Sequence, residues 1–99
     1  MAVVLTLSWP GYTKEQYDHL LELVDWESDP AQGGIFHVVW WEGDTMEIVD
    51  VWESQDDWQK FFDERLSPHN DAVGVTGQPD AQFHDVHRYF NPQAGKAGE

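Results

Sequence analysis

The segment from Gly34 to Trp52 constrains the fold of this chain more than any other stretch. It contains two runs rich in β-branched and aromatic residues, separated by Gly43 and Asp44. Such runs on either side of a short turn that contains glycine predict an antiparallel β-hairpin. If Gly43 and Asp44 are the two turn residues, the pairing of the two strands follows by counting back from the turn.

This register places a histidine and an aspartate on the same face of the hairpin. His37 is expected opposite Asp50, because successive side chains of a strand alternate between the two faces of a sheet. The rest of that face is apolar and aromatic, in the expected pairs Trp41–Met46, Val39–Ile48 and Ile35–Trp52. A slip by one residue would move His37 and Asp50 to opposite faces.

The composition limits the class of protein. The 99 residues include six Trp, five Phe, three Tyr and no Cys. One aromatic core can therefore form, while disulfides and thiolate metal sites are excluded. A formal net charge of −14 argues against nucleic acid and anionic membrane surfaces as partners. The N-terminal segment has no basic region and its apolar run stops at Ser8 and Pro10, so we expect neither a signal peptide nor a membrane span, and a cytoplasmic protein.

The remaining sequence predicts two further strands and two helices. Residues 2–9 indicate a strand buried on both faces. Thr13 is a good N-cap for a helix that ends near Trp26, with its apolar face formed by Tyr17, Leu20, Leu21 and Val24. Ser54 is expected to cap a second helix that breaks or restarts at Ser67-Pro68. A last strand is expected over about residues 82–90.

The resulting order βαββαβ predicts an α+β, ferredoxin-like fold, with a four-stranded antiparallel sheet and two helices on one face. Residues 1–90 would form this single domain, and residues 91–99 a disordered tail without large apolar side chains. The other sheet face would be bare and apolar, with Phe36, Val38, Trp40, Val49 and Val51. Because soluble monomers rarely expose such a face, we expect a homodimer.

Three motifs resemble the dimeric α/β-barrel superfamily. They are Pro10-Gly11-x-Thr13-x-x-x-Tyr17-Asp18, Phe36-His37-Val38 and Val49-Asp50-Val51-Trp52-Glu53-Ser54. The superfamily includes cofactor-free antibiotic-biosynthesis monooxygenases, haem-degrading monooxygenases and polyketide cyclases, so the motifs are more specific for the fold than for the reaction. The resemblance implies a dimer formed through the sheets, with a pocket between each sheet and its own helices.

The haem-degrading branch is matched in one of its three features. That branch has an asparagine in the first strand, a tryptophan in the second helix and an iron-ligating histidine after that helix. Here the first strand has no asparagine, the helix position holds Phe61, and His69 lies near the ligand position with a spacing about two residues short. Haem degradation is therefore a lesser alternative.

The pair of His37 and Asp50 is the sharpest candidate for chemistry. A carboxylate beside an imidazole fixes its tautomer and raises its basicity, which suits a general base acting on a phenol or on a carbon next to a carbonyl. A buried polar pair that only satisfies itself is the competing interpretation. If the face of the last strand that carries His87 and Tyr89 turns to the helices, both line the same pocket, and a Tyr-His combination resembles the cyclase branch.

Substrate contacts are expected from the same sheet face, the second helix and the loop after it. The candidates are Trp41, Ile48, Trp52, Trp58 and His69. The tryptophans either stack on a planar ligand or simply fill the core. No histidine pair has the spacing of a helical metal site, and we expect neither a metal nor an organic cofactor.

Together these features predict a cofactor-independent enzyme, monooxygenase-like or polyketide-cyclase-like, that binds a hydrophobic aromatic or polyketide-type substrate between sheet and helices. His37, polarised by Asp50, would be the base, and His87 or Tyr89 would orient an oxygen atom. The alternative is a non-catalytic dimeric module that binds a small hydrophobic molecule or has a structural role.

Overall fold

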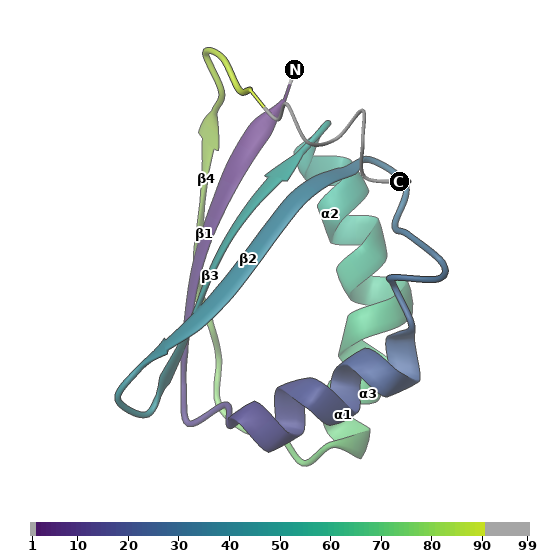
Figure 1. Ribbon diagram of the computed structural model, residues 1–99, viewed down its shortest axis with the longest axis vertical. Coiled ribbons are helices and arrows are strands. Elements are labelled where there is room, and N and C mark those ends of the chain that lie inside the picture. Colours follow the sequence, from purple (N-terminus) through teal and green to yellow (C-terminus); the bar gives the residue numbers. More distant parts are fainter. Residues whose placement is uncertain (1, 91–99) are drawn as a thin grey trace.

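The computed structural model describes residues 2–90, and these form an antiparallel sheet with helices on one face (Figure 1). The strands are β1 (Val3–Pro10), β2 (Gly34–Glu42), β3 (Thr45–Trp52) and β4 (Asp80–Asp85), in the spatial order β2-β3-β1-β4. The helices are α1 (Lys14–Val24), α2 (Gln55–Phe61) and α3 (Ser67–Ala72), with a π-helical turn, η1 (Phe62–Leu66), between α2 and α3. This is the predicted ferredoxin-like α+β fold; the predicted disordered tail, 91–99, lies outside the described residues.

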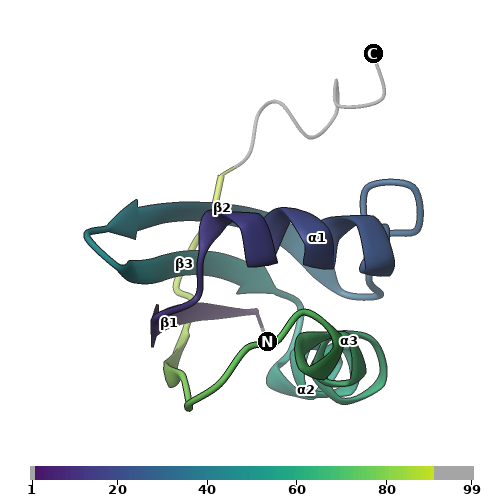
Figure 2. The same cartoon turned by 90° about the horizontal axis from the view of Figure 1, so that it is seen from below.

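The two helical segments cover different halves of the sheet. α1 crosses the α2–η1–α3 segment at a steep angle (Figure 2). Tyr17 of α1 packs edge-on against Trp41 of β2, with ring centroids 5.7 Å apart. Trp58 of α2 packs in the same way against Phe83 of β4, at 5.3 Å. The candidate functional site lies between these two helix–sheet contacts, above the helix-facing side of the sheet.

One face of β1 supplies the floor of the core. Val3, Leu5, Leu7 and Trp9 are buried, whereas the residues between them are half-buried or exposed. Within the single chain, the prediction of a strand buried on both faces is therefore wrong. The near-continuous apolar sequence suggested it, but the helices cover only the face reached by every second residue.

The hairpin has the predicted register around the candidate pair. His37 lies opposite Asp50 and Trp41 opposite Met46. Gly43 has the positive φ, 59°, that a tight hairpin turn needs and that glycine adopts without strain. The turn residues therefore predicted the alignment of the two strands correctly.

The far end of the hairpin differs from the prediction. A bulge between Gly34 and Phe36 places Gly34, not Ile35, opposite Trp52. A bulge adds one unpaired residue and bends the strand. The predicted Ile35–Trp52 pair is wrong for this reason.

Side-chain caps fix where the two main helices begin. The Thr13 hydroxyl accepts the Gln16 N–H at 3.1 Å, and the Gln16 side chain accepts the Thr13 N–H at 2.9 Å. The Ser54 hydroxyl caps α2. α1 ends at Val24, earlier than predicted, because Asp25 takes a left-handed conformation with φ 56°.

The helical segment restarts at Ser67-Pro68, which is one of the two predicted alternatives, and a π turn joins α2 to the new helix α3. The Ser67 N–H donates to the Phe62 carbonyl, five residues earlier. Proline has no N–H and its ring crowds the carbonyl four residues before it. A wider turn just before Pro68 relieves that conflict and lets α3 follow without a loop.

β4 ends at Asp85, so the prediction of a strand to Phe90 is wrong. β1 begins at Val3, which pairs with Asp85. One further backbone bond joins the Val86 N–H to the Ala2 carbonyl at 2.9 Å. Beyond it the described chain offers β4 no partner strand, and the last described residues leave the sheet.

The sheet face away from the helices carries exposed apolar side chains. Phe36 is 48% exposed, Val38 39% and Trp40 40%.

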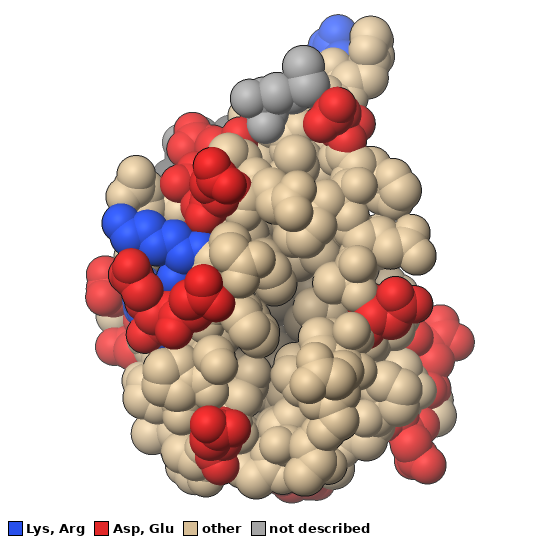
Figure 3. All heavy atoms as spheres, turned by 180° about the vertical axis from the view of Figure 1, so that it is seen from behind, with Lys and Arg blue, Asp and Glu red and all other residues tan. Residues whose placement is uncertain are grey.

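On the face drawn in Figure 3, acidic residues surround a central hollow bordered by uncharged residues.

Within the described range, none of the helices has the length and apolar character needed to cross a membrane.

Candidate active site

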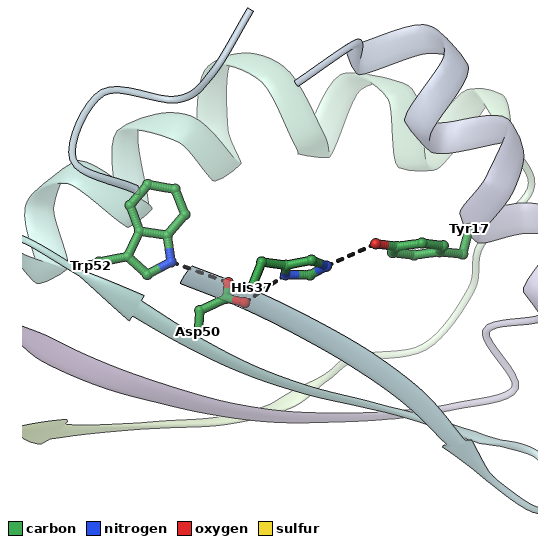
Figure 4. Close-up of polar contacts among 4 residues, drawn as sticks. All are labelled: Tyr17, His37, Asp50 and Trp52. Carbon is green, nitrogen blue, oxygen red and sulfur yellow. Dashed lines mark hydrogen bonds and ion pairs between the residues drawn. The ribbon is translucent and has the colours of Figure 1, made fainter. Parts of the chain in front are cut away.

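His37 and Asp50 are in contact on the helix-facing side of the hairpin (Figure 4). His37 Nδ1 lies 2.6 Å from Asp50 Oδ1. The other carboxylate oxygen accepts a hydrogen bond from Trp52 Nε1 at 3.1 Å. Asp50 is only 6% exposed, and each of its carboxylate oxygens has a hydrogen-bond partner inside the protein.

The hydroxyl of Tyr17 completes this chain of side chains on the other side of the imidazole. It lies 2.8 Å from His37 Nε2. The sequence placed Tyr17 only on the buried face of the first helix, because helical spacing does not tell which sheet residue a helix residue meets. Its orientation is fixed by Trp41, which packs edge-on against it and donates Nε1–H to the Tyr12 carbonyl at 2.7 Å.

The hydrogen bonds assign the proton positions. Burial, followed by the charge of Asp50, raises the pKa of Tyr17, so the phenol keeps its proton at neutral pH. In the neutral imidazole, His37 Nε2 accepts that O–H, which leaves the ring proton on Nδ1, where it donates to Asp50. His37 is therefore held as the Nδ1–H tautomer, with its basic nitrogen facing a phenol.

Two cavities meet at the hydrogen-bonded pair of His37 and Asp50. The inner cavity, about 50 Å³, lies between the buried sheet face and the helices, and the outer cavity, about 200 Å³, is bounded by residues of the α1–β2 connection and the start of β2. Both are lined by His37 and Asp50, and also by Trp26, Trp52 and Phe61. The His37 side chain keeps 28% of its surface exposed, so the imidazole lies at the boundary of the two cavities.

Three of the predicted substrate contacts line the inner cavity, namely Ile48, Trp52 and Trp58. Trp41 lines neither the inner nor the outer cavity. Its contacts make it a residue that positions Tyr17, and the prediction that it touches substrate is not supported by its location.

His69 also lines neither cavity. The neighbouring Asn70 faces the inner cavity instead, and its side-chain oxygen accepts the Tyr12 hydroxyl at 2.8 Å. The orientation of α3 after the π turn determines that Asn70, and not His69, faces the inner cavity. The sequence predicted a loop at His69, so this orientation could not be predicted. In residues 2–90, no three His, Cys, Asp or Glu side chains converge as a ligand set for a metal ion.

His87 and Tyr89 lie away from the site, and their predicted place beside His37 is wrong. Both follow the end of β4 and are exposed. Tyr89 lies near Phe36 and Val51, on the sheet face opposite to the helices. The tyrosine that contacts His37 comes from α1 instead.

No protein-family model and no curated protein matches the chain. Solved structures match it over most of its length. SnoaB, a cofactor-independent oxygenase from Streptomyces nogalater, has a TM-score of 0.65 and 12% identity, with 89% of this chain and 95% of that chain covered. A monooxygenase from the gene ActVA-Orf6 of Streptomyces coelicolor, in complex with nanaomycin D, has a TM-score of 0.62 and 20% identity, with 92% of each chain covered.

A Caulobacter crescentus protein, provisionally assigned as an antibiotic biosynthesis monooxygenase, has a TM-score of 0.69 and 12% identity, with 88% of this chain and 91% of that chain covered. At these identities the likeness concerns the fold. The chain therefore shares the ferredoxin-like fold of antibiotic biosynthesis monooxygenase-like proteins, the group that its sequence motifs resemble.

Proposed function

We propose that this protein is a cofactor-independent, monooxygenase-like enzyme that acts on a hydrophobic aromatic substrate, with His37 as its general base. One observation carries the proposal: the imidazole is held between a carboxylate and a phenol at the boundary of two cavities. The fold is one found in a cofactor-independent oxygenase, which supports the reaction class without fixing the substrate.

The Asp50 carboxylate prepares His37 for proton abstraction. It accepts the Nδ1–H at 2.6 Å, which leaves Nε2 as the nitrogen that can take a proton, and it stabilises the imidazolium that forms when Nε2 does so. The bond from Trp52 Nε1 fixes the other carboxylate oxygen. The carboxylate therefore cannot turn away from the ring without losing a second partner.

Tyr17 passes the proton from substrate to His37. As the substrate gives a proton to the Tyr17 oxygen, the original phenol proton moves to His37 Nε2 along the 2.8 Å hydrogen bond. The raised pKa of Tyr17 means that the tyrosine conducts the proton and does not store the negative charge. The charge stays on the substrate as an enolate or phenolate.

The lining of the cavities favours a planar apolar substrate. Trp26, Trp52 and Phe61 border both cavities, and Phe36 borders the outer one. Aromatic rings stack well against such side chains. We place a fused aromatic ketone with an acidic methylene, such as anthrone, at the mouth of the outer cavity, with its ionisable edge reaching past His37, which lines both cavities, to the Tyr17 hydroxyl on the inner side.

The test is oxygen uptake with anthrone, followed for the wild type, His37→Ala, Asp50→Asn and His19→Ala. General-base removal is expected to lower kcat by about 10²-fold or more. Asp50→Asn is expected to act similarly, because an amide donor facing Nδ1 moves the ring proton to Nε2. His19 is an exposed histidine on α1 and serves as the matched control, with activity unchanged.

Two results would contradict the proposal. Turnover that survives His37→Ala would remove His37 as the base. Quenching of tryptophan fluorescence by anthrone without oxygen uptake would identify a binding module instead of an enzyme.

We also propose that a second copy of the chain covers the outer sheet face, defined by Phe36, Val38 and Trp40. These side chains alternate along β2 and are between 39% and 48% exposed, and contiguous exposed apolar patches mark interaction surfaces. A twofold axis pairs the same face on both copies and requires no additional partner.

A further inference from the structure

The inner cavity is too small for the organic substrate proposed above. Its volume is about 50 Å³, whereas a cavity that binds benzene measures about 150 Å³. The outer cavity, about 200 Å³, is the one with room for an aromatic ring. The inner cavity therefore suits a guest of only a few atoms.

The inner cavity is also unsuited to water. Its lining is mostly apolar and includes Leu5, Leu7, Met46, Ile48, Trp58 and Leu66. Among its polar groups, the Tyr12 hydroxyl donates to Asn70 Oδ1 at 2.8 Å and Trp9 Nε1 donates to the Thr76 carbonyl at 3.1 Å. The Tyr17, His37 and Asp50 side chains are bonded to one another. Among the described residues no buried side-chain nitrogen or oxygen lacks a partner. A buried water needs two to four polar partners, so this cavity favours an apolar guest.

We propose that the inner cavity is a binding site for dioxygen, an uncharged, apolar, diatomic molecule of suitable size. This inference rests on the proposed oxygenase function. His37 lines both cavities, and Tyr17 lines the inner one beside it. Dioxygen in the inner cavity would therefore lie next to the edge of the substrate that has just lost its proton.

The reaction balances with dioxygen as the only oxidant. After deprotonation, the methylene carbon of the anthrone carbanion transfers electrons to dioxygen and forms a carbon–oxygen bond. The oxygen–oxygen bond then breaks, one atom remains as the new carbonyl, and the other leaves as water with the two methylene hydrogens. The carbon loses four electrons and dioxygen gains four. The base only moves protons in this sequence.

Dioxygen itself is the probe for the site. It is paramagnetic, so it shortens the relaxation times of the methyl protons that it approaches. We expect the methyl groups of Leu5, Leu7 and Met46 to relax faster under dioxygen pressure than under nitrogen pressure. The methyl groups of Leu23, which is 39% exposed on α1, report random contact from solvent. Equal enhancement at buried and exposed methyls would overturn the proposal.

Paired variants separate the two cavities. Leu66 lines the inner cavity only, and Ile35 lines the outer but not the inner cavity. Leu66→Phe is expected to abolish the dioxygen-induced relaxation and to raise the KM for dioxygen several-fold, with the KM for anthrone unchanged. Ile35→Phe is expected to raise the KM for anthrone and leave the relaxation intact. Leu66→Met, which conserves volume, controls for disturbed packing and should behave as the wild type.

The outcomes distinguish the site from the function. Selective relaxation that Leu66→Phe abolishes supports the dioxygen site, even if no oxygen uptake occurs; the absence of uptake would overturn the proposed oxygenase function alone. Oxygen uptake without selective relaxation, or relaxation unchanged in a folded Leu66→Phe protein, would overturn the dioxygen site alone. Thermal unfolding of each variant shows whether it is folded.

Discussion

The relay depends on single hydroxyl groups, and two buried tyrosines allow its contribution to be measured. Tyr17→Phe removes the hydroxyl that bonds His37, whereas Tyr12→Phe removes one that bonds Asn70. Each loss should lower the free energy of unfolding by about 1 kcal/mol. Only Tyr17→Phe is expected to lower kcat, by about 10-fold or more if proton transfer limits turnover.

Steady-state oxygen uptake and urea unfolding of the two variants check this prediction. Similar losses of stability with unequal losses of kcat would identify a proton relay. Equal kcat values would show that Tyr17 only supports the packing of His37.

The same tyrosines make stability sensitive to alkali. Burial raises the pKa of Tyr12 and of Tyr17 above the ordinary value of 10.0. At higher pH the unfolded chain releases these protons while the folded protein retains them, so the free energy of unfolding falls as pH rises above about 10. Each tyrosine contributes a slope of about 1.4 kcal/mol per pH unit there. Tyr17→Phe should lower the slope by one such contribution in urea unfolding at alkaline pH, and an unchanged slope would contradict the assignment.

At the scale of elements, the connection before β2, which borders the outer cavity at Pro30, Ala31 and Gly34, lies against Asp57 of α2 at Gly33. Its φ is +84°, and a Cβ there would collide with the Asp57 side chain. Its carbonyl also accepts the Glu53 N–H at 2.8 Å. Gly11 has nearly the same φ, +83°, but nothing within 4 Å of its Cβ position. A comparison of alanine substitutions at the two glycines therefore separates the cost of a left-handed backbone from the cost of a steric clash.

Gly11→Ala should lower the free energy of unfolding by about 1–2 kcal/mol, the cost of a left-handed alanine. Gly33→Ala should cost about 1–3 kcal/mol more, because the methyl group must displace Asp57. Urea unfolding measures both values. Equal losses of stability would show that the backbone at Gly33 moves to accommodate the methyl group and does not support the wall of the outer cavity.

The sequence predicted those elements whose signals are local. The Gly43 turn predicted the hairpin register, and the register predicted the contact between His37 and Asp50, which the structure confirms. The end of β4 was mispredicted because Tyr89 and Phe90 have strand-like character, whereas a strand stops where its neighbour stops. That limit is set by the start of β1, about eighty residues earlier in the chain.

The site was predicted in part for the same reason. Tyr17 was assigned to the buried face of its helix, but its contact with His37 depends on how α1 is docked on β2. Trp26, which borders both cavities, lies just after α1, and its ring centroid is 4.7 Å from that of His37. Neither contact has a sequence periodicity that could have revealed it.

At the scale of the whole molecule, the uncovered sheet face predicts the assembly state. Val38 is 39% exposed on β2, and Leu23 is equally exposed on α1. Val38→Glu is expected to convert the proposed dimer into monomers, because it puts two charges into one twofold interface. Leu23→Glu adds the same charge elsewhere and should leave the mass unchanged.

Sedimentation equilibrium measures the mass of both variants. The net charge of −14 per chain adds repulsion between the copies, so dimerisation should also strengthen as salt increases. A wild-type protein that is monomeric at high salt and high concentration would rule out the pairing of the two sheets.

The π turn before Pro68 determines which side of α3 faces the interior of the protein. Each residue of an α-helix turns the chain by about 100°, so removing one residue from η1 would advance every side chain of α3 by that amount. Asp71 would then occupy the present place of Asn70 and direct a carboxylate at the Tyr12 hydroxyl, inside an apolar interior. The length of one five-residue segment thus decides whether the innermost side chain of the final helix is neutral or ionised.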